Sequence, residues 1–124
     1  MHLSHERPDY SFVLRAADAR SALVNEQVLS RSFAIAPDHL IEAWDAPATA
    51  AELQAAHLAP LLELKPELVV LGTGERQVFP PPAALAACLT RGVGIEAMDN
   101  AAAARTYNVL AGEGRRVVVA MLLG

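Results

Sequence analysis

The sequence predicts a three-layer α/β protein, whose mixed central sheet has an antiparallel N-terminal part and a C-terminal βαβαβ unit. Two observations favour this fold class. Before residue 47, short apolar segments follow one another with brief connections, which is typical of antiparallel strands. After residue 49, apolar runs poor in charge alternate with alanine-rich segments of helical length, which is typical of parallel strands joined by helices. The chain is expected to form a single domain, residues 1–124, with one core.

The N-terminal part is predicted to be a meander of short strands that extends the parallel sheet. Its first segment alternates Tyr10, Phe12 and Leu14 with smaller or polar residues, a period of two. Asn25-Glu26 marks one of the turns. The expected strands are Tyr10–Arg15, Ser21–Val24, Gln27–Leu29, Ser32–Ala36 and Leu40–Trp44.

A helical segment in two short pieces is predicted between residues 49 and 66. Thr49 is a residue type that favours helix N-caps, and Glu52 follows it at the spacing of a capping box. Pro60 is expected to interrupt the segment, because proline lacks an amide hydrogen and its ring clashes with the preceding turn. Pro66 is expected to end it.

The C-terminal half is predicted to alternate three buried strands with two helices, joined by right-handed crossovers. The helix over Ala83–Arg91 follows a run of prolines, and its inner face is expected to contain Leu85, Cys88 and Leu89. Asp99 is expected to cap the next helix. The remaining elements are expected at Glu67–Leu71, Val93–Met98, Asn100–Ala111 and Arg116–Leu123.

Composition and charge argue against several classes of protein. The formal net charge is −4 and no basic stripe is present, so no nucleic-acid partner is expected. The single cysteine, Cys88, excludes an internal disulfide and is expected to be a small buried hydrophobe. No apolar run approaches the roughly 20 residues of a membrane span. The first residues resemble neither a signal peptide nor a transit peptide, so a cytoplasmic location is expected.

One apolar run ends in Gly72-Thr73-Gly74, at the carboxyl end of a predicted strand, where open α/β sheets place ligands. A dinucleotide-binding fingerprint would need a third glycine where the chain has Gln77, and the lysine of a P-loop is absent. Two interpretations stay open. The segment is either a structural turn or a cradle for a small anion or other ligand, assisted by Thr73 and Arg76.

Asp99 follows the next parallel strand and is therefore expected at the same edge of the sheet as the glycine segment. A cleft between Gly72–Arg76 and Met98–Asn100 is the candidate binding site. The other interpretation of Asp99 is a helix cap. No second carboxylate or histidine stands nearby in the sequence for acid–base chemistry.

The group Arg105-Thr106-Tyr107-Asn108 interrupts an alanine-rich helix, where asparagine is unfavourable. In one interpretation Tyr107 packs in the core while Asn108 or Arg105 bonds the backbone of a neighbouring loop. In the other, these residues form a polar patch that meets a partner or ligand.

The residues support no metal site, no cofactor and no catalytic set. The four histidines lack metal-ligand spacing. No Gly-x-Ser-x-Gly elbow supports a hydrolase triad. Whether the protein is an enzyme stays open, and a non-enzymatic role is favoured.

A long C-terminal stretch carries a family resemblance. It reads PELVVLGTGERQVFPPPAALAACLTRGVGIEAMDNAAAARTYNVLAGEGRRV. The ordered combination of the glycine segment, the proline-led helix, Gly92–Met98 and Thr106-Tyr107-Asn108 resembles a family of small bacterial and archaeal proteins of unassigned function. The family's mitochondrial relative is an assembly factor of respiratory complex I, usually called assembly factor 3.

The resemblance implies a three-layer α/β fold with a mixed sheet and a non-enzymatic accessory role. It implies binding to other proteins, such as respiratory complex subunits or other assembly factors, during maturation of a subassembly. It brings no catalytic residues. We expect no organelle-targeting leader, and we expect a monomer or weak dimer. The alternatives are a small-molecule or anion binder, or an enzyme, that uses the cleft near Gly72–Gly74 and Asp99, and a scaffold whose motifs serve folding alone.

Overall fold

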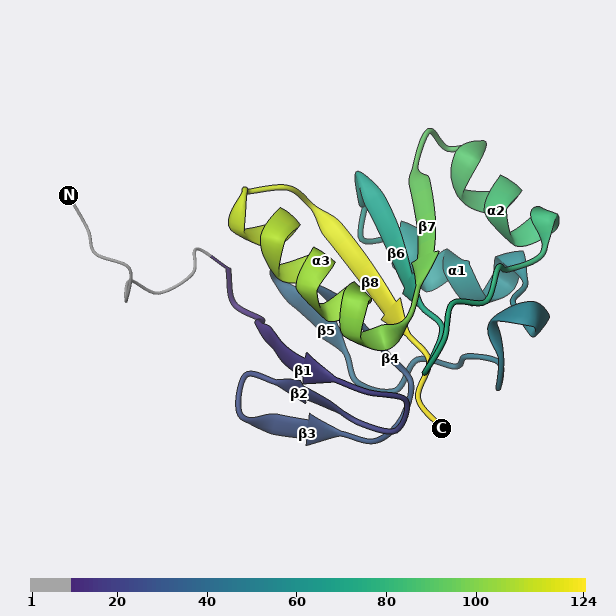
Figure 1. The fold of residues 1–124 in the computed structure, drawn as a ribbon. Coiled ribbons are helices and arrows are strands. Elements are labelled where there is room, and N and C mark those ends of the chain that lie inside the picture. Colours follow the sequence, from purple (N-terminus) through teal and green to yellow (C-terminus); the bar gives the residue numbers. More distant parts are fainter. Residues whose placement is uncertain (1–9) are drawn as a thin grey trace.

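The computed structural model describes residues 10–124, which form two sheets and three α-helices (Figure 1). The strands are β1 (Leu14–Ala17), β2 (Ala22–Val24), β3 (Gln27–Leu29), β4 (Phe33–Ala36), β5 (His39–Ile41), β6 (Leu68–Gly72), β7 (Gly94–Met98) and β8 (Val117–Met121). The helices are α1 (Ala55–Leu62), α2 (Pro82–Leu89) and α3 (Asn100–Gly112), with a 3-10 turn at Ala50–Glu52.

The central sheet has five strands in the order β5-β4-β8-β6-β7. Strand β6 lies between β8 and β7 and is parallel to both, so that Val69 stands opposite Val118 and Ile95. Strand β4 is antiparallel to β8 and to β5. The predicted βαβαβ unit and the antiparallel extension are both present, and the fold class is confirmed.

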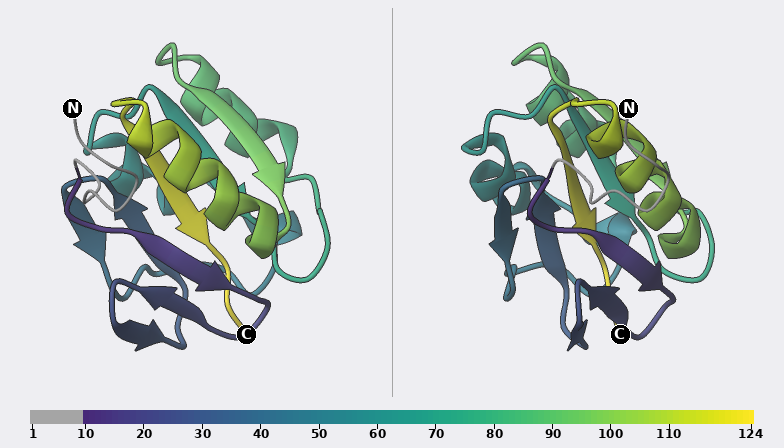
Figure 2. Two further views of the ribbon diagram at one scale, coloured as in Figure 1. Left: turned by 60° about the vertical axis from the view of Figure 1, so that its left-hand side comes forward. Right: turned by 90° about the vertical axis from the view of Figure 1, so that its left-hand side faces the viewer.

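Helices cover both faces of the central sheet (Figure 2). Helices α1 and α2 pack on one face, where Leu58, Leu61 and Cys88 share a buried cluster with Val69. Helix α3 packs on the opposite face, where Tyr107 belongs to a second cluster. The two clusters use alternate residues of β6, as expected for a strand buried on both faces.

Strands β1, β2 and β3 form a separate three-stranded antiparallel sheet. This differs from the single extended meander that the sequence suggested. The small sheet packs on the α3 side of the molecule, where Leu14, Val24 and Leu29 join the same buried cluster as Phe33. The first strand is also shorter than predicted and begins only at Leu14.

Pro60 lies inside α1 and does not interrupt it, so the predicted position of the break was wrong. The two helical pieces are separated earlier, where Leu53 has an extended conformation between the 3-10 turn and α1. Leu58 and Leu61 are fully buried. Their packing offsets the hydrogen bond that proline cannot make, because most helical stability in proteins comes from the buried face.

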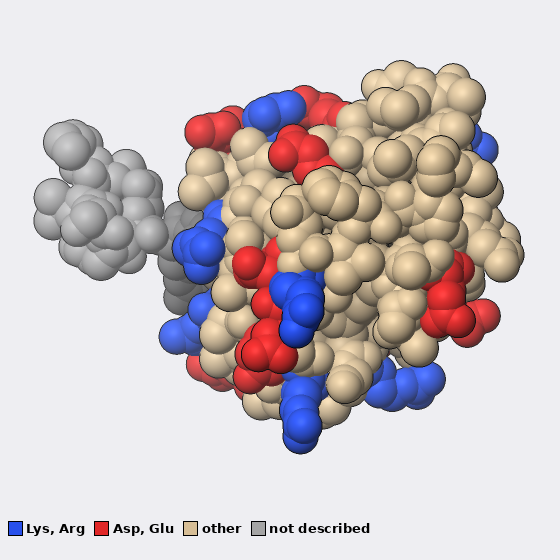
Figure 3. All heavy atoms as spheres, turned by 45° about the vertical axis from the view of Figure 1, so that its right-hand side comes forward, with Lys and Arg blue, Asp and Glu red and all other residues tan. Residues whose placement is uncertain are grey.

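Helix α2 departs from its predicted orientation at one residue. Cys88 is fully buried as expected, and burial raises the pKa of its thiol. Leu89, however, is 60% exposed rather than on the inner face. The inward positions are Ala84 and Cys88, and Leu89 stands next to that row on the outside. On the side of the molecule that carries α2, a broad region shows neither acidic nor basic side chains (Figure 3).

Candidate functional site

The glycine segment and the start of α3 lie at the same edge of the central sheet, as predicted. Gly72 is the last residue of β6 and pairs with Met98 of β7 and Met121 of β8. Beyond it, the Thr73 amide donates to the Met98 carbonyl at 2.9 Å. The carboxyl ends of the two parallel strands therefore meet here, where this class of sheet usually places ligands.

Asn100 joins the segments that meet at this edge. Its Nδ2 donates to the carbonyls of Asp18 and Leu122, both at 2.8 Å, while its Oδ1 accepts from the Gly74 amide at 2.9 Å. The Asn100 amide also donates to the Gly74 carbonyl at 2.9 Å. Asn100 is fully buried, and each of its polar atoms has a partner. We call Asn100 and these three partners the Asn100 junction.

Sequence reasoning named Asn100 only as the first residue of a helix and the boundary of a cleft. Its role depends on Asp18 and Leu122, which lie 82 and 22 residues away. The sequence signal that could have indicated this role is the position of Asn100, directly after the helix cap Asp99 and at the same predicted sheet edge as the glycine segment.

The two glycines of the segment serve different needs. A Cβ on Gly72 would stand 2.6 Å from the Asn100 Oδ1, closer than real Cβ contacts. Gly74 has open space around its Cα but a φ of +109°, which a residue with a Cβ rarely adopts. The first glycine therefore permits a close approach, and the second permits the backbone turn.

The Thr73 hydroxyl organises the loop that follows β6. It donates to the Arg76 carbonyl at 2.6 Å and accepts from the Val78 amide at 3.1 Å. Across the loop, the Gln77 Nε2 donates to the Ala97 carbonyl at 2.8 Å. Hydrogen bonds thus join the loop to the end of β7, and the amides of Thr73, Gly74 and Val78 have partners within the chain. The Arg76 side chain is exposed, so a ligand cradle here, which stays a prediction, would depend on it.

Asp99 caps α3. Its Oδ1 accepts from the Ala102 amide at 2.8 Å, which satisfies one of the free donors at the helix start. The predicted cap is confirmed. Within residues 10–124, no group of three or more histidine, cysteine or acidic side chains is placed to hold a metal ion.

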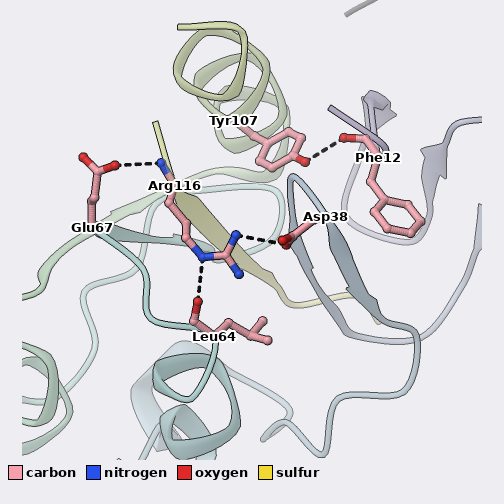
Figure 4. A network of polar contacts seen from close by, with 6 residues as sticks. All are labelled: Phe12, Asp38, Leu64, Glu67, Tyr107 and Arg116. Atoms are coloured by element: carbon pink, nitrogen blue, oxygen red, sulfur yellow. Dashed lines mark hydrogen bonds and ion pairs between the residues drawn. The ribbon is translucent and has the colours of Figure 1, made fainter. Parts of the chain in front are cut away.

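The residues Tyr107 and Asn108 attach β1 to α3. The Tyr107 hydroxyl donates to the Phe12 carbonyl at 2.6 Å (Figure 4). Burial raises the pKa of Tyr107 well above its usual value. The Asn108 Nδ2 donates to the Leu14 carbonyl at 2.6 Å, and its Oδ1 accepts from the Leu14 amide at 3.2 Å. The Asn108 side chain therefore gives β1 a pair of backbone hydrogen bonds of the kind that a neighbouring strand would give. This is in keeping with the interpretation in which Tyr107 packs in the core and Asn108 bonds a neighbouring backbone.

Arg105 differs from its neighbours on α3 because its side chain is exposed. It lines a groove of about 250 Å³ between α3 and β1, together with Arg15 and several alanines. The predicted site residues therefore fall into two groups. Gly72, Thr73, Gly74, Arg76 and Asp99 stand at the carboxyl edge of the central sheet, and Arg105, Tyr107 and Asn108 face β1 or the groove beside it.

Arg116 makes a third polar cluster, and it was not among the predicted site residues. Its Nε donates to the Leu64 carbonyl at 2.7 Å, and its Nη1 pairs with the Asp38 carboxylate at 2.9 Å (Figure 4). Its amide donates to the Glu67 carboxylate at 2.9 Å. Arg116 thereby links three connections that are far apart in the sequence: the β4–β5 turn, the α1–β6 loop and the α3–β8 loop.

Comparison with known proteins identifies the family. Residues 14–122 match the model of a family described as a protein of unknown function (DUF498/DUF598). The chain belongs to this family. A protein from Xanthomonas campestris, with a structure determined by NMR, is 59% identical; the match covers 100% of this chain and 93% of that one, with a TM-score of 0.83.

Two curated relatives match over about half of this chain. NADH dehydrogenase (ubiquinone) 1 alpha subcomplex assembly factor 3 from Bos taurus is 39% identical over 62 residues, 50% of this chain and 34% of that protein. The 13 kDa major membrane protein of Francisella tularensis is 34% identical over 65 residues, 52% of this chain and 53% of that protein. Matches thus span only about half or a third of these relatives' own lengths. The resemblance to the assembly-factor family is confirmed.

None of the helices in residues 10–124 has the length and apolar character that crossing a membrane requires.

Proposed function

We propose that this protein is a non-enzymatic accessory factor that binds other proteins while a larger complex is assembled. The observation that carries the proposal is the relationship to assembly factor 3. More specifically, we propose that its partners are subunits or other assembly factors of a respiratory NADH dehydrogenase. We propose that the protein binds them in the cytoplasm as a monomer or weak dimer.

The geometry of the motif residues supports binding rather than catalysis. The polar atoms of Thr73, Asn100 and Asn108 bond backbone groups of this same chain. Asp99 accepts the bond of a helix cap. A general acid or base needs a polar atom directed at a substrate instead. These hydrogen bonds within the chain support a non-enzymatic role.

Quantitative affinity capture from the native host tests the proposal. The tagged chain is expressed at its natural level, and the proteins that co-purify are compared with those that an unrelated tagged protein of similar size retains. Subunits or assembly factors of a respiratory NADH dehydrogenase are expected to be enriched at least tenfold. Enrichment of no consistent partner in repeated captures would contradict it.

A further inference from the structure

The groove of about 250 Å³ between α3 and β1 has an arginine on each of its two walls. Arg15 stands on β1 and Arg105 on α3, and both are exposed. The lining also includes four alanines: Ala16, Ala17, Ala101 and Ala104. We call these six residues the arginine groove. Its volume lies just below the usual range of small-molecule sites, so the groove suits a small ligand.

Hydrogen bonds between the two walls place the arginines at the same level of the groove. Leu14, the first residue of β1, is bonded to the Asn108 side chain, and the carbonyl that follows β1 accepts from Asn100. The strand and the helix therefore run side by side in opposite directions (Figure 2). Arg15 follows Leu14 by one residue, about 3.3 Å along the strand, and Arg105 precedes Asn108 by three, about 4.5 Å along the helix. The two side chains thus start from opposite walls, within about 1 Å of each other along the groove.

A β-bulge lies at Arg15. The pairing of β1 with β2 changes register between Leu14 and Ala16, so Arg15 is the extra residue of the bulge. Bulges change the direction of a side chain and are frequent next to functional sites. In this protein the bulge occurs at the only charged residue of β1, and that residue lines the groove.

The charges on the walls of the groove are of one sign. Neither β1 nor α3 contains an acidic residue. Asp18 and Asp99, which flank these elements at one end, accept hydrogen bonds from backbone amides, and Glu113 follows Arg105 by eight residues, about 12 Å along the helix. Among the residues that the structure describes, neither groove arginine forms an ion pair with an acidic side chain. Two guanidinium groups on facing walls repel each other, and an anion between them would remove that repulsion.

We propose that the arginine groove binds a small organic anion. A carboxylate or phosphate head group lies between the two guanidinium groups, which bind such oxyanions through charge-assisted hydrogen bonds. A short apolar body lies against the methyl groups of the four alanines. This site is distinct from the Asn100 junction, and it does not depend on the proposed assembly function.

Titration of the full chain, followed by amide NMR, tests the proposal. The three probes share a butyl body and differ in the head group: butyl phosphate, pentanoate and butylammonium, compared at constant ionic strength. At least one of the two anions is expected to shift the amide signals of β1 and α3 until they saturate, at about millimolar concentration. The anion that binds more tightly identifies the head group as phosphate or carboxylate. Butylammonium is expected to shift none of these signals.

Variants assign the binding to the two arginines. Arg15→Gln and Arg105→Gln are each expected to weaken binding of the anion roughly tenfold, because each removes charge-assisted hydrogen bonds. Arg91→Gln is the matched control, since Arg91 is also exposed but lies just beyond α2, and it is expected to leave the affinity unchanged. All three side chains are exposed, so the melting temperatures of the variants should stay close to that of the wild-type chain.

Three outcomes would overturn the inference. The first is the absence of saturable shifts with both anions. The second is equal binding of butylammonium, which would show that the groove accepts a butyl body whatever its charge. The third is an affinity that survives both groove substitutions in folded variants, because the anion would then bind elsewhere. Affinity capture of protein partners is measured separately, so this inference and the proposed function can fail independently.

Discussion

The Asn100 junction and the exposed residues of α2 (Pro82, Ala83, Ala86 and Leu89), which we call the α2 face, are opposites in composition and exposure. The junction is polar and buried, and its side-chain amide bonds three separate segments. The α2 face is apolar and exposed, and no described residue covers it. The region whose sequence resembles a ligand site makes hydrogen bonds within the fold, whereas a helix without any polar motif leaves apolar side chains exposed. In this chain, polar residues in a motif are therefore poor evidence of a binding surface unless their atoms are unpaired.

The largest effect is expected from removing the amide at the centre of the junction. Asn100→Ala leaves the carbonyls of Asp18 and Leu122 and the amide of Gly74 without their partner. A buried unpaired group costs about 1–3 kcal/mol, so the free energy of unfolding should fall by about 3–5 kcal/mol. Urea unfolding followed by circular dichroism measures it.

Asn108→Ala is the control for this prediction, because it removes an asparagine from the same helix at a half-buried position. Its loss should be smaller, since water can reach the Leu14 groups that it leaves. Equal losses for the two variants would mean that burial of Asn100 is not what makes it important.

A second prediction concerns Gly72, whose added Cβ would meet the Asn100 Oδ1 at 2.6 Å. Gly72→Ala should lower the free energy of unfolding by about 2–3 kcal/mol, because one of the two residues must move. In an Asn100→Ala background the same change should cost at least about 1 kcal/mol less, since the clashing atom is gone. A double-mutant cycle by urea unfolding measures this coupling. Simple additivity would mean that the close approach does not explain the glycine.

Much of the fold could be predicted because it depends on local patterns. The apolar run of β6 and the Asp99 cap are visible over a few residues, and both were placed correctly apart from one residue at the strand ends. The separation of β1–β3 from the central sheet was not visible. It depends on Tyr107 and Asn108 bonding Phe12 and Leu14, contacts between residues more than 90 positions apart.

The candidate site was predicted with the correct neighbours but without its central residue. Parallel pairing of β6 and β7 follows from their apolar character and spacing, and it brought Gly72 to Met98 as expected. The role of Asn100 was missed because a buried amide is recognised by the carbonyls around it, which a linear sequence does not reveal. Leu89 was misplaced for a related reason, since a helix with apolar residues on every side gives no signal of which side faces the core.

A third prediction uses the raised pKa of Tyr107, which follows from burial. An unfolded tyrosine loses its proton near pH 10. Between that pH and the higher folded pKa, the folded state holds one more proton, so stability falls as pH rises, by up to about 1.4 kcal/mol per pH unit. Denaturant unfolding between pH 8 and 11 measures the slope, with pH 8 and 11 chosen to span the tyrosine range.

Tyr107→Phe is the control for this slope. The variant is expected to be less stable at pH 8, because the Phe12 carbonyl loses its donor. Above pH 10, however, its stability should fall less steeply than that of the wild-type chain, with the remaining slope due to Tyr10 and Cys88, whose pKa values burial also raises. Identical slopes would show that Tyr107 ionises as easily in the folded protein as in the unfolded chain.

The smallest change in the free energy of unfolding is expected from a substitution at the α2 face. It tests whether the exposed member of the comparison contributes to stability. Leu89 is 60% exposed, so Leu89→Ser should change the free energy of unfolding by no more than about 0.5 kcal/mol. Leu61→Ser, at a fully buried position on α1, should cost several times more. Both are measured by urea unfolding of the isolated protein. A loss above about 1 kcal/mol for Leu89→Ser would mean that the face contributes to the fold. The contrast with the Asn100 junction would then disappear.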